Sequence, residues 1–438
     1  MNRHGRARDV SPAERSLLRL QRRTFTHFWH EANPENGLLP DNTHSTGVPA
    51  SIAGVGLALG AYVTGVERGF VTRAAAIGRT LTTLRFFWNG TQSTAADAVG
   101  YKGFFYHFLD VKTGRRAWQS ELSTIDTTIL LAGALTASRY FDRGTPAERE
   151  IRDLATALYR RVDWRWAQHG KPTVTHGWTP EAGFLPNRWT GYSEGLLLYL
   201  LALGSPSKPV STESYAAWTS TYQWKKVYGH EFLYAGPLFI HQLSHLWIDF
   251  RGVQDDFMRS KGIDYFENSR RATYVQQEYA IRNPRGFVDY GPLLWGLSSS
   301  NGPDSGSFRV RGGRGRFMGY RARSVPYGPD DGTLAPWAVV ASLPFAPEIV
   351  VPTLLEFERR RPRLVTKYGL MCSFNPTYRR APHRHGWVSN GHFVIDQGPV
   401  VLMIENYRSG LIWRLMRQCP FVIAGLKRAG FRGGWLTA

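Results

Sequence analysis

Apolar residues recur every three to four positions along much of the chain, which is the period of an amphipathic helix. The two clearest apolar faces carry Leu17, Leu18, Gln21, Phe25, Phe28 and Trp29, and Ile151, Leu154, Leu158 and Val162. Each is preceded by a capping box with proline at the first helical position, Ser-Pro-Ala-Glu at 11–14 and Thr-Pro-Ala-Glu at 145–148. The pattern therefore predicts helices that begin near residues 11 and 145.

Similar patterns predict most of the remaining chain to be helical. The expected helices cover residues 50–66, 73–88, 124–140, 192–203, 229–246, 262–282, 334–342, 347–360, 397–407 and 409–428. Strand-like alternation of apolar and polar residues is rare. About a dozen helices joined by long loops predict an all-α fold and, at this length, favour an (α/α)6 toroid, an inner ring of helices inside an outer ring. Loops and inner-helix ends would line a cleft at one end.

The composition is that of a globular protein, with 42% hydrophobic and 20% charged residues among 438. No block rich in Ser, Gly or Pro divides the chain, so we expect one domain over residues 11–438 after a flexible tail at 1–10. The two cysteines, Cys372 and Cys419, are too few for a disulfide framework. The sequence gives no prediction of the oligomeric state.

Two features of the sequence bear on location. The N-terminus is basic but lacks the apolar core of a signal peptide, and the apolar run 52–66 is too short to cross a bilayer. We therefore expect no membrane span and a cytoplasmic protein as the sequence stands, or a periplasmic one if its N-terminus has been trimmed.

The net charge of +20 raises the question of a nucleic-acid partner. The excess is mostly arginine and is spread along the chain, without a Lys-rich arm, zinc-ligand spacing or a nucleic-acid-binding module. We therefore expect no nucleic-acid partner, while an anionic ligand or cell-envelope component stays open.

Aromatic residues make up 13% of the chain and include 15 tryptophans. Several cluster in loops beside polar residues: Trp178 and Trp189 with Tyr192, Tyr222 with Trp224 and Tyr228, and Tyr290 with Trp295. Flat rings next to hydrogen-bonding groups suit sugars, which have apolar faces and hydroxyl rims. The alternative is that these rings fill a large core. Taken together, the loop clusters favour a carbohydrate ligand as much as a packing role.

Three carboxylates lie at the starts of different apolar helices: Asp126, Glu194 and Asp396. One such residue is explained by helix capping or by the helix dipole. Three are less easily dismissed, because the starts of inner helices in a toroid face one cleft. Asp249 and Asp255 are also unusual, since they flank Arg251 in an aromatic segment.

Glycoside hydrolysis needs a protonated carboxyl group beside the leaving oxygen and an ionised one that activates water or attacks the sugar. Glu194 lies between aromatic residues and an apolar run, which would raise its pKa and suit the acid. Asp396 has polar neighbours in Asn390 and Gln397, which suits an ionised base. The sequence therefore predicts Glu194 and Asp396 as the catalytic pair.

A metal site is the main alternative chemistry. His241 and His245 are spaced i and i+4, as zinc ligands on a helix are, but the glutamate of an HExxH motif and an obvious third ligand are missing. We favour hydrogen bonds from these histidines to substrate or to Asp249. No nucleotide-binding or nucleophile motif is convincing, so we expect neither a metal nor a cofactor.

Long motifs resemble, in order, those of one protein family. They are FFYHFLD (104–110), ELSTIDTTILLAGAL (121–135), FLPNRWTGYSEGLLLYLLALGSP (184–206), WTSTYQW (218–224), HQLSHLWIDFRGVQDDFMR (241–259), GIDYFENSRRATY (262–274), DDGTLAP (330–336), SLPFAPEIV (342–350) and IDQGPVVLMIENYRSGLIW (395–413). The sequence resembles, from about residue 15 to its C-terminus, the putative glucoamylase family. That family includes the β-1,2-glucanases of glycoside hydrolase family 144 and the cyclising domain of cyclic β-1,2-glucan synthases.

The resemblance implies an (α/α)6 toroid that hydrolyses β-1,2-glucan without a metal, usually with inversion. It implies that Glu194 is the general acid, that Asp396 is the base, and that Asp126 contacts or supports the substrate. We expect substrate contacts from Asp126, Arg188, Trp189, Tyr192, His241, Gln242, His245, Asp249, Arg251, Trp295, Asp330 and Tyr407.

The sequence departs from the family at three places. Asn301 stands where relatives usually carry aspartate, and the segments 323–331 and 379–391 are unusual. These differences leave endo and exo action open, although endo action is favoured. They also leave open a transglycosylase that closes or transfers β-1,2-glucan, and a non-catalytic glycan-binding protein.

Overall fold

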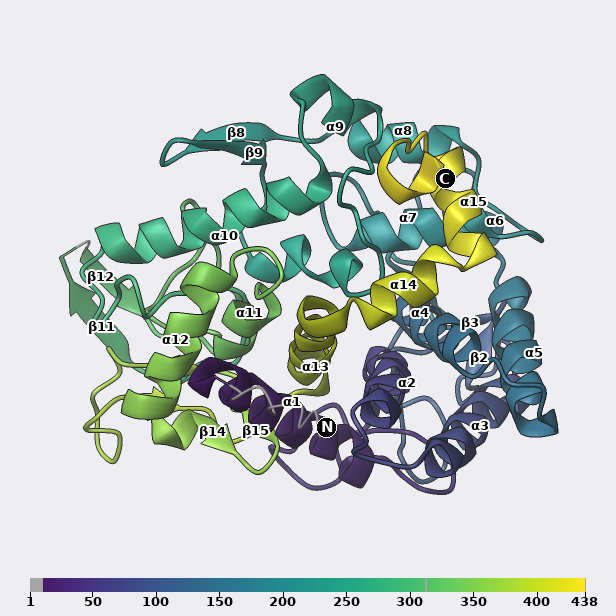
Figure 1. Cartoon of the computed structure of the whole chain (residues 1–438), viewed down its shortest axis with the longest axis horizontal. Helices are drawn as coiled ribbons and strands as arrows, with labels where there is room; N and C mark the ends of the chain where they lie inside the picture. Colours follow the sequence, from purple (N-terminus) through teal and green to yellow (C-terminus); the bar gives the residue numbers. More distant parts are fainter. Residues whose placement is uncertain (1–10, 312, 438) are drawn as a thin grey trace, which may run out of the picture.

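The computed structural model describes residues 11–311 and 313–437, and helices dominate it (Figure 1). The expected tail at residues 1–10 lies outside the described residues. The α-helices are α1 Pro12–Glu31, α2 Ile52–Glu67, α3 Arg73–Asn89, α4 Thr124–Tyr140, α5 Pro146–Arg161, α6 Trp164–Gln168, α7 Gly195–Gly204, α8 Glu213–Thr219, α9 Asp256–Lys261, α10 Tyr265–Arg282, α11 Pro336–Ala341, α12 Pro347–Arg360, α13 Val394–Ser409, α14 Leu411–Arg417 and α15 Pro420–Arg428. Short 3-10 helices are η1 Leu238–His241, η2 Leu243–Leu246, η3 Pro362–Leu364 and η4 Gly434–Thr437.

The strands are short and lie in the connections between helices. They are β1 Ala50–Ser51, β2 Gly100–Tyr101, β3 Phe104–Phe105, β4 Phe108–Leu109, β5 Leu122–Ser123, β6 Gly177–Thr179, β7 Gly183–Phe184, β8 Trp224–Val227, β9 His230–Leu233, β10 Ser299–Ser300, β11 Ser307–Val310, β12 Gly313–Arg316, β13 Arg321–Ala322, β14 Val365–Thr366, β15 Gly369–Leu370, β16 Phe374–Asn375 and β17 Trp387–Val388. The strands β5, β6 and β7 form one three-stranded sheet, and the others pair two by two and antiparallel. The structure is therefore all-α with small β elements in its loops.

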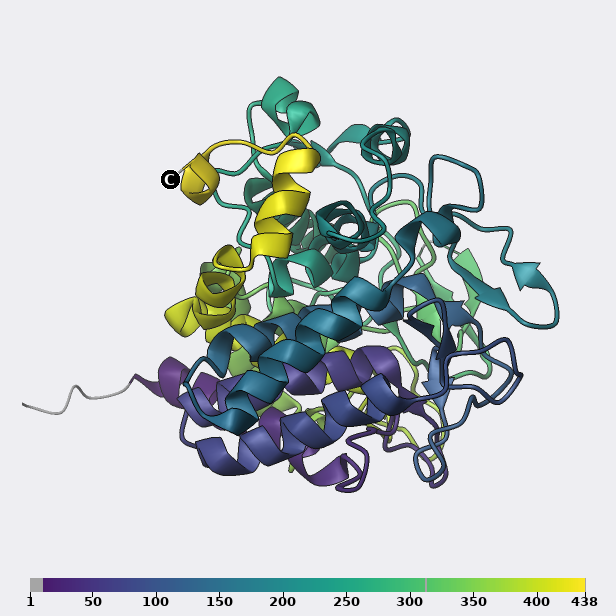
Figure 2. The same cartoon turned by 90° about the vertical axis from the view of Figure 1, so that its right-hand side faces the viewer.

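The helices fall into two kinds. The helices α2, α4, α7 and α11 are buried around almost their whole circumference, as is most of α13. They pack in a row, α7 on α4, α4 on α2, α2 on α13 and α13 on α11. The helices α1, α3, α5 and α12 bury one side each and cover this row, and Figure 2 shows the N-terminal helices running side by side.

The contact between α2 and α4 is made backbone to backbone. A Cβ atom placed on Gly133 would lie only 2.0 Å from the carbonyl oxygen of Gly56. Glycine at these two positions therefore lets the helices approach far more closely than helices with larger side chains at the contact. This close approach sets how α4, the helix that carries Asp126, packs on α2.

Two helix predictions are wrong. Residues 229–246 form β9 and the short η1 and η2, because Gly229 adopts a positive φ in the β8–β9 turn and Pro237 interrupts the segment. Residues 409–428 form two helices, since Pro420 lacks an N–H and starts α15 after α14 has ended. The short helices α6, α8 and α9 were not predicted. No helix in the described ranges is long and apolar enough to cross a bilayer.

Candidate active site

A cavity of about 270 Å³ lies where the first residues of α4, α7, α11 and α13 meet. Its lining residues are His107, Ile125, Asp126, Ile129, Glu194, Phe239, Gln242, Leu243, Ser299, Tyr320, Trp337, Ile395, Asp396 and Pro399. A second hollow of about 530 Å³ shares His107, Asp126, Tyr320 and Ile395 with it, so the two hollows adjoin. The cavity therefore brings together the three carboxylates at helix starts that stand out in the sequence.

Glu194 immediately precedes α7, but its side chain does not cap that helix. Instead, the Ser193 hydroxyl accepts a hydrogen bond from the Gly195 N–H at 3.3 Å. Burial raises the pKa of the Glu194 carboxyl to about 7, and the charge of nearby Asp126 adds to this effect. A carboxyl group with this pKa is protonated in a large fraction of molecules at neutral pH, as a general acid requires.

Asp396 lies in the first turn of α13 and is buried. Its Oδ2 atom has no hydrogen-bond partner within the described chain. Burial raises the pKa of Asp396 well above its usual value, while the Cys372 thiol opposes the shift and Asp41 adds to it. An unpartnered oxygen in a cavity wall is free to bind water or a sugar hydroxyl.

The expected surroundings of Asp396 are wrong. The sequence neighbours Asn390 and Gln397 suggested a polar environment that keeps the carboxylate ionised. Asn390 is exposed, and the Gln397 side chain donates to the carbonyl oxygen of Leu370 at 2.8 Å. Neither amide is available to Asp396, because residues adjacent in sequence point in different directions at a helix start.

Asp126 belongs to an ionic cluster with His107 and Glu121. The Ser123 hydroxyl donates to Asp126 and accepts from its backbone N–H. The His107 Nδ1 lies 3.0 Å from Glu121, its Nε2 lies 3.7 Å from Asp126, and its ring stacks on Phe108 at 4.0 Å. Burial alone would lower the pKa of His107, but the two carboxylates outweigh it and raise the pKa to about 9. His107 is therefore a cation at neutral pH.

The donor atoms of His107, Glu121 and Asp126 all lie within 4.8 Å of one another, which is close enough to surround a metal ion. His107 pairs with Glu121 and with Asp126, so the same three side chains form an ion-pair network at the cavity wall.

We expect His107→Gln to lower the free energy of unfolding by about 2 kcal/mol near neutral pH and by much less at high pH. The pKa of His107 is higher in the folded than in the unfolded protein, so its stabilisation is complete below about pH 6.5 and disappears as the pH rises through about 9. Urea unfolding of both proteins at about pH 6 and about pH 10 measures the difference. Exposed His30, replaced in the same way, is the control. A stability gap of equal size at both pH values would contradict the assignment.

Only some of the other predicted substrate contacts reach the cavity. Gln242 lines it, and its side chain donates to the Ala338 carbonyl at 2.6 Å and to the Ser342 hydroxyl at 2.7 Å. His241 and His245 are buried outside it, where His241 donates to the Ala235 carbonyl and His245 shares a hydrogen bond with Ser269. They lie on two successive 3-10 helices, so the predicted helical i, i+4 face does not exist.

Asp249 and Arg251 pair with each other at 2.6 Å, and Asp249 also pairs with Arg417. Asp249 is buried in this network, which lies outside the cavity lining. The prediction that the pair contacts substrate at the catalytic cavity is therefore corrected, because both charges are used to join the 249–251 loop to α14.

Six further predicted contacts lie outside the cavity lining, namely Arg188, Trp189, Tyr192, Trp295, Asp330 and Tyr407. Most have partners within the protein. Arg188 donates to the Thr173 hydroxyl, Trp189 to the Thr124 hydroxyl and Trp295 to the Thr353 hydroxyl. Asp330 accepts from Tyr279 and Tyr290, Tyr192 packs against Tyr265, and Tyr407 is exposed near the far end of α13. Five of these residues therefore pack or hydrogen-bond within the protein, and Tyr407 lies away from the cavity.

Several cavity residues were not singled out from the sequence, notably His107, Phe239, Tyr320 and Trp337. His107 lies in the motif FFYHFLD, which forms part of the family resemblance. That motif is the sequence feature by which His107 could have been recognised as a site residue. Tyr320 lies in a glycine-rich loop with no local pattern that indicates its role. Only the folding of distant loops onto the helix starts brings these side chains together.

Comparison with known proteins gives consistent matches. The family model described as putative glucoamylase matches residues 186–420. A putative glucoamylase structure from Bacteroides uniformis is 30% identical, with a TM-score of 0.86 over 98% of this chain and 100% of that one. An endo-β-1,2-glucanase from Chitinophaga pinensis, solved with sophorotriose and glucose, is 27% identical, with a TM-score of 0.85 over 97% and 100% of the two chains.

A curated relative from Parabacteroides distasonis is 27% identical over 449 residues. It is named an exo β-1,2-glucooligosaccharide sophorohydrolase acting at the non-reducing end. The match covers 95% of this chain but only 58% of that relative, so the chain spans little more than half of the relative's length.

Proposed function

Since the chain belongs to the putative glucoamylase family, we propose that it is a glycoside hydrolase that cleaves β-1,2-linked glucan. The activities named for the curated relative and for the Chitinophaga pinensis enzyme both concern β-1,2-glucans. The observation that carries the proposal is the convergence of Asp126, Glu194 and Asp396 in one cavity, from the starts of three helices. Two carboxyl groups of different character are what glycoside hydrolysis needs.

The proposal includes the architecture. The row of buried helices α7, α4, α2, α13 and α11 forms part of the inner ring of an (α/α)6 toroid, and α1, α3, α5 and α12 belong to its outer ring. Residues from 11 to the C-terminus form a single domain. The contact of α1 with α13 supports this, because it joins the two ends of the chain in one core.

Glu194 is the general acid in the proposed mechanism. Its raised pKa keeps a proton available, and the proton passes to the scissile glycosidic oxygen as the bond to the anomeric carbon breaks. The transfer is direct or runs through a substrate hydroxyl. The leaving sugar then departs with a neutral hydroxyl group, so no alkoxide is expelled.

Asp396 is the general base. Its unpartnered Oδ2 accepts a proton from the attacking water, directly or through a short relay, and the attack inverts the anomeric centre. This role needs the ionised form, so the raised pKa of Asp396 predicts that activity falls as the pH is lowered through that pKa. Asp126, paired with His107, contacts the bound sugar and raises the pKa of Glu194 through its charge.

Endo cleavage is the favoured mode, because the second hollow adjoins the cavity and offers space for a longer glucan chain on that side. A panel of linear and cyclic β-1,2-glucan, starch and laminarin tests the function. We expect shorter reducing oligosaccharides from linear β-1,2-glucan and no release from starch or laminarin.

The same panel separates the alternatives. Rings or lengthened chains without new reducing ends would indicate a transglycosylase instead of a hydrolase. Binding of β-1,2-glucan without any product would indicate a glycan-binding protein. Reducing sugar from starch or laminarin alone would overturn the proposed linkage.

A further inference from the structure

A two-stranded hairpin projects from the wall of the cavity. The strands β11 and β12 form it, and it is inserted between β10 and β13, which pair with each other at its base. Ser299 of β10 and Tyr320 just before β13 both line the cavity. Figure 1 shows the hairpin at the left edge of the molecule. The base of the hairpin therefore contributes two residues to the cavity wall.

One face of the hairpin is apolar and the other is basic. Phe308 is buried against Phe287 and Phe317, with ring centroids 5.5 and 5.0 Å away. On the exposed face, Arg309 pairs directly with Arg314 across the strands. Like charges directly opposite each other destabilise a hairpin. The Arg309–Arg314 pair therefore does not stabilise the hairpin.

More arginines surround this pair. Arg316 follows on the same face, Arg311 lies at the turn, and Arg380 donates to the Ser307 carbonyl at 2.9 Å from the loop after β16. We call Arg309, Arg311, Arg314, Arg316 and Arg380 the basic strip. None of the five makes an ion pair with any carboxylate in the described ranges 11–311 and 313–437. In the sequence of 299–323 and 376–391 the only carboxylate is Asp304.

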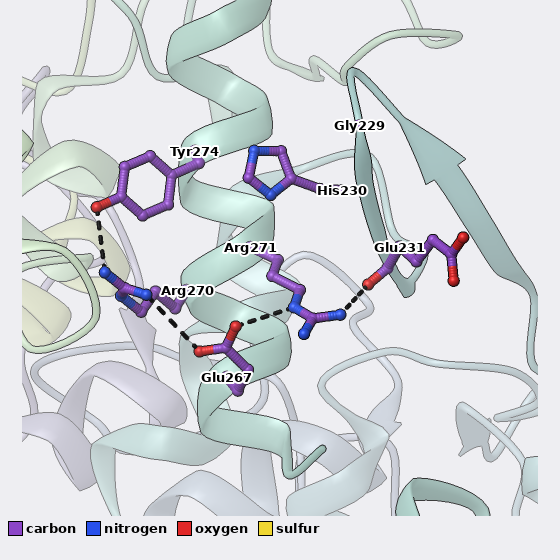
Figure 3. A pocket seen from close by; sticks show the side chains of 7 residues that line it. All are labelled: Gly229, His230, Glu231, Glu267, Arg270, Arg271 and Tyr274. Atoms are coloured by element: carbon purple, nitrogen blue, oxygen red, sulfur yellow. Dashed lines mark hydrogen bonds and ion pairs between the residues drawn. The ribbon is translucent and has the colours of Figure 1, made fainter. Parts of the chain in front are cut away.

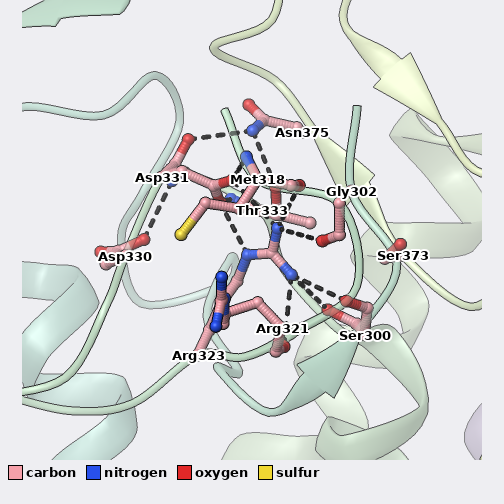
Figure 4. Close-up of polar contacts among 12 residues, drawn as sticks. Ser300, Gly302, Met318, Arg321, Arg323, Asp330, Asp331, Thr333, Ser373 and Asn375 are labelled. Atoms are coloured by element: carbon pink, nitrogen blue, oxygen red, sulfur yellow. Dashed lines mark hydrogen bonds and ion pairs between the residues drawn. The ribbon is translucent and has the colours of Figure 1, made fainter. Parts of the chain in front are cut away.

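The base of the hairpin is fixed by a buried ion pair (Figure 4). Arg323 is fully buried, lies 2.7 Å from Asp331 and donates to the carbonyl oxygens of Ser300 and Met318. It thus ties both ends of the insertion to the segment that precedes α11. The position of the basic strip relative to the cavity is set by this network.

Another arginine-lined hollow, of about 530 Å³, provides a contrast (Figure 3). There Arg270 and Arg271 on α10 both pair with Glu267, and Arg270 also pairs with Glu348. Their charges are compensated within the protein. The basic strip differs because none of its five arginines has a carboxylate partner in the described ranges.

We propose that the basic strip binds anionic substituents, such as carboxylate or phosphodiester groups, carried by the glucan whose neutral backbone occupies the cavity. This inference rests on the proposed function, because the cavity must hold the sugar chain. A nucleic acid could use the same charges, but the connection of the strip to the sugar cavity favours one ligand that engages both. Exposed arginines attract such groups electrostatically, and salt weakens the attraction.

The test compares linear β-1,2-glucan with the same glucan after partial chemical succinylation. We expect the wild-type KM to be about tenfold lower for the succinylated glucan at low salt, since several exposed ionic contacts each contribute a factor of a few. The double variant Arg309→Gln/Arg314→Gln should reduce this ratio to about threefold or less, as should high salt. The matched control is Arg165→Gln/Arg432→Gln, which removes two exposed arginines on α6 and near the C-terminus and should keep the wild-type ratio.

A KM ratio near one for the wild type, or a ratio unchanged in the hairpin variant, would overturn the inference. Binding of random duplex DNA is measured as well. If the DNA binds more tightly than succinylated glucan, and Arg309→Gln/Arg314→Gln abolishes that binding, the partner is a nucleic acid and the inference is overturned. Calorimetric binding of both glucans is measured in parallel. If neither glucan is hydrolysed, the proposed function fails, and equal binding of the two glucans would then reject the basic strip as well.

Discussion

Replacing Glu194 with glutamine is expected to lower kcat/KM for linear β-1,2-glucan by about 10²–10⁴-fold, the usual contribution of a general acid. Glutamine keeps the shape of the side chain but has no proton to transfer to the leaving oxygen. The measurement is the initial rate of reducing-end release by both proteins. A loss below about tenfold would remove Glu194 from the chemistry.

Two controls separate an acid from a residue that merely shapes the cavity. A β-1,2-linked disaccharide of 4-nitrophenol has a leaving group that departs without protonation, so Glu194→Gln should impair its hydrolysis much less. Equal losses on both substrates would mean that the variant damages the cavity rather than proton donation. Glu35→Gln changes an exposed glutamate that is distant in sequence from Glu194. It controls for the change of charge and should keep wild-type rates.

Replacing Asp396 with asparagine is expected to lower kcat/KM for the same glucan by about 10²–10⁴-fold, since the attacking water loses its base. The same change should leave the free energy of unfolding at neutral pH equal or higher. The reason is that the native structure buries this carboxyl with an unpartnered oxygen and raises its pKa, which disfavours the ionised form present in the unfolded chain.

The opposite directions of these two effects make the test specific. A variant that lost both activity and stability would point to a structural role for Asp396. One that kept more than about a tenth of the activity would assign the base elsewhere, with Asp126 the next carboxylate to replace. Asp153→Asn on the exposed side of α5 is the matched control and should change neither quantity.

Most helices could be predicted because their apolar period is local information. The prediction failed at 229–246, where the apolar residues are as frequent as in a helix but Gly229 and Pro237 break the backbone pattern. It also missed the division at Pro420. In both places a glycine or a proline interrupts an apolar run that otherwise has the helical period.

The carboxylates of the site could be predicted because each begins an apolar helix, a position that is unusual in sequence. The residues around them could not. Trp189 and Trp295 donate to threonine hydroxyls and Asp330 accepts from two tyrosines, so each polar group is used inside the core. A sequence does not reveal whether an aromatic beside a polar residue has a partner in the protein or meets a ligand. The cation His107 depends on Glu121 and Asp126, which come close to it only when Tyr106 and Leu122 pair across a β-bridge.

The pH dependence of kcat/KM on linear β-1,2-glucan tests the central claim most directly, because it reports the ionisation of the free enzyme's acid and base. If Glu194 supplies the proton, the rate should fall on the alkaline side with a midpoint near pH 7, as that carboxyl loses its proton. This alkaline limb should disappear for the 4-nitrophenyl substrate. A rate that remains constant from neutral pH to about pH 9 would contradict the assignment of Glu194 as the general acid.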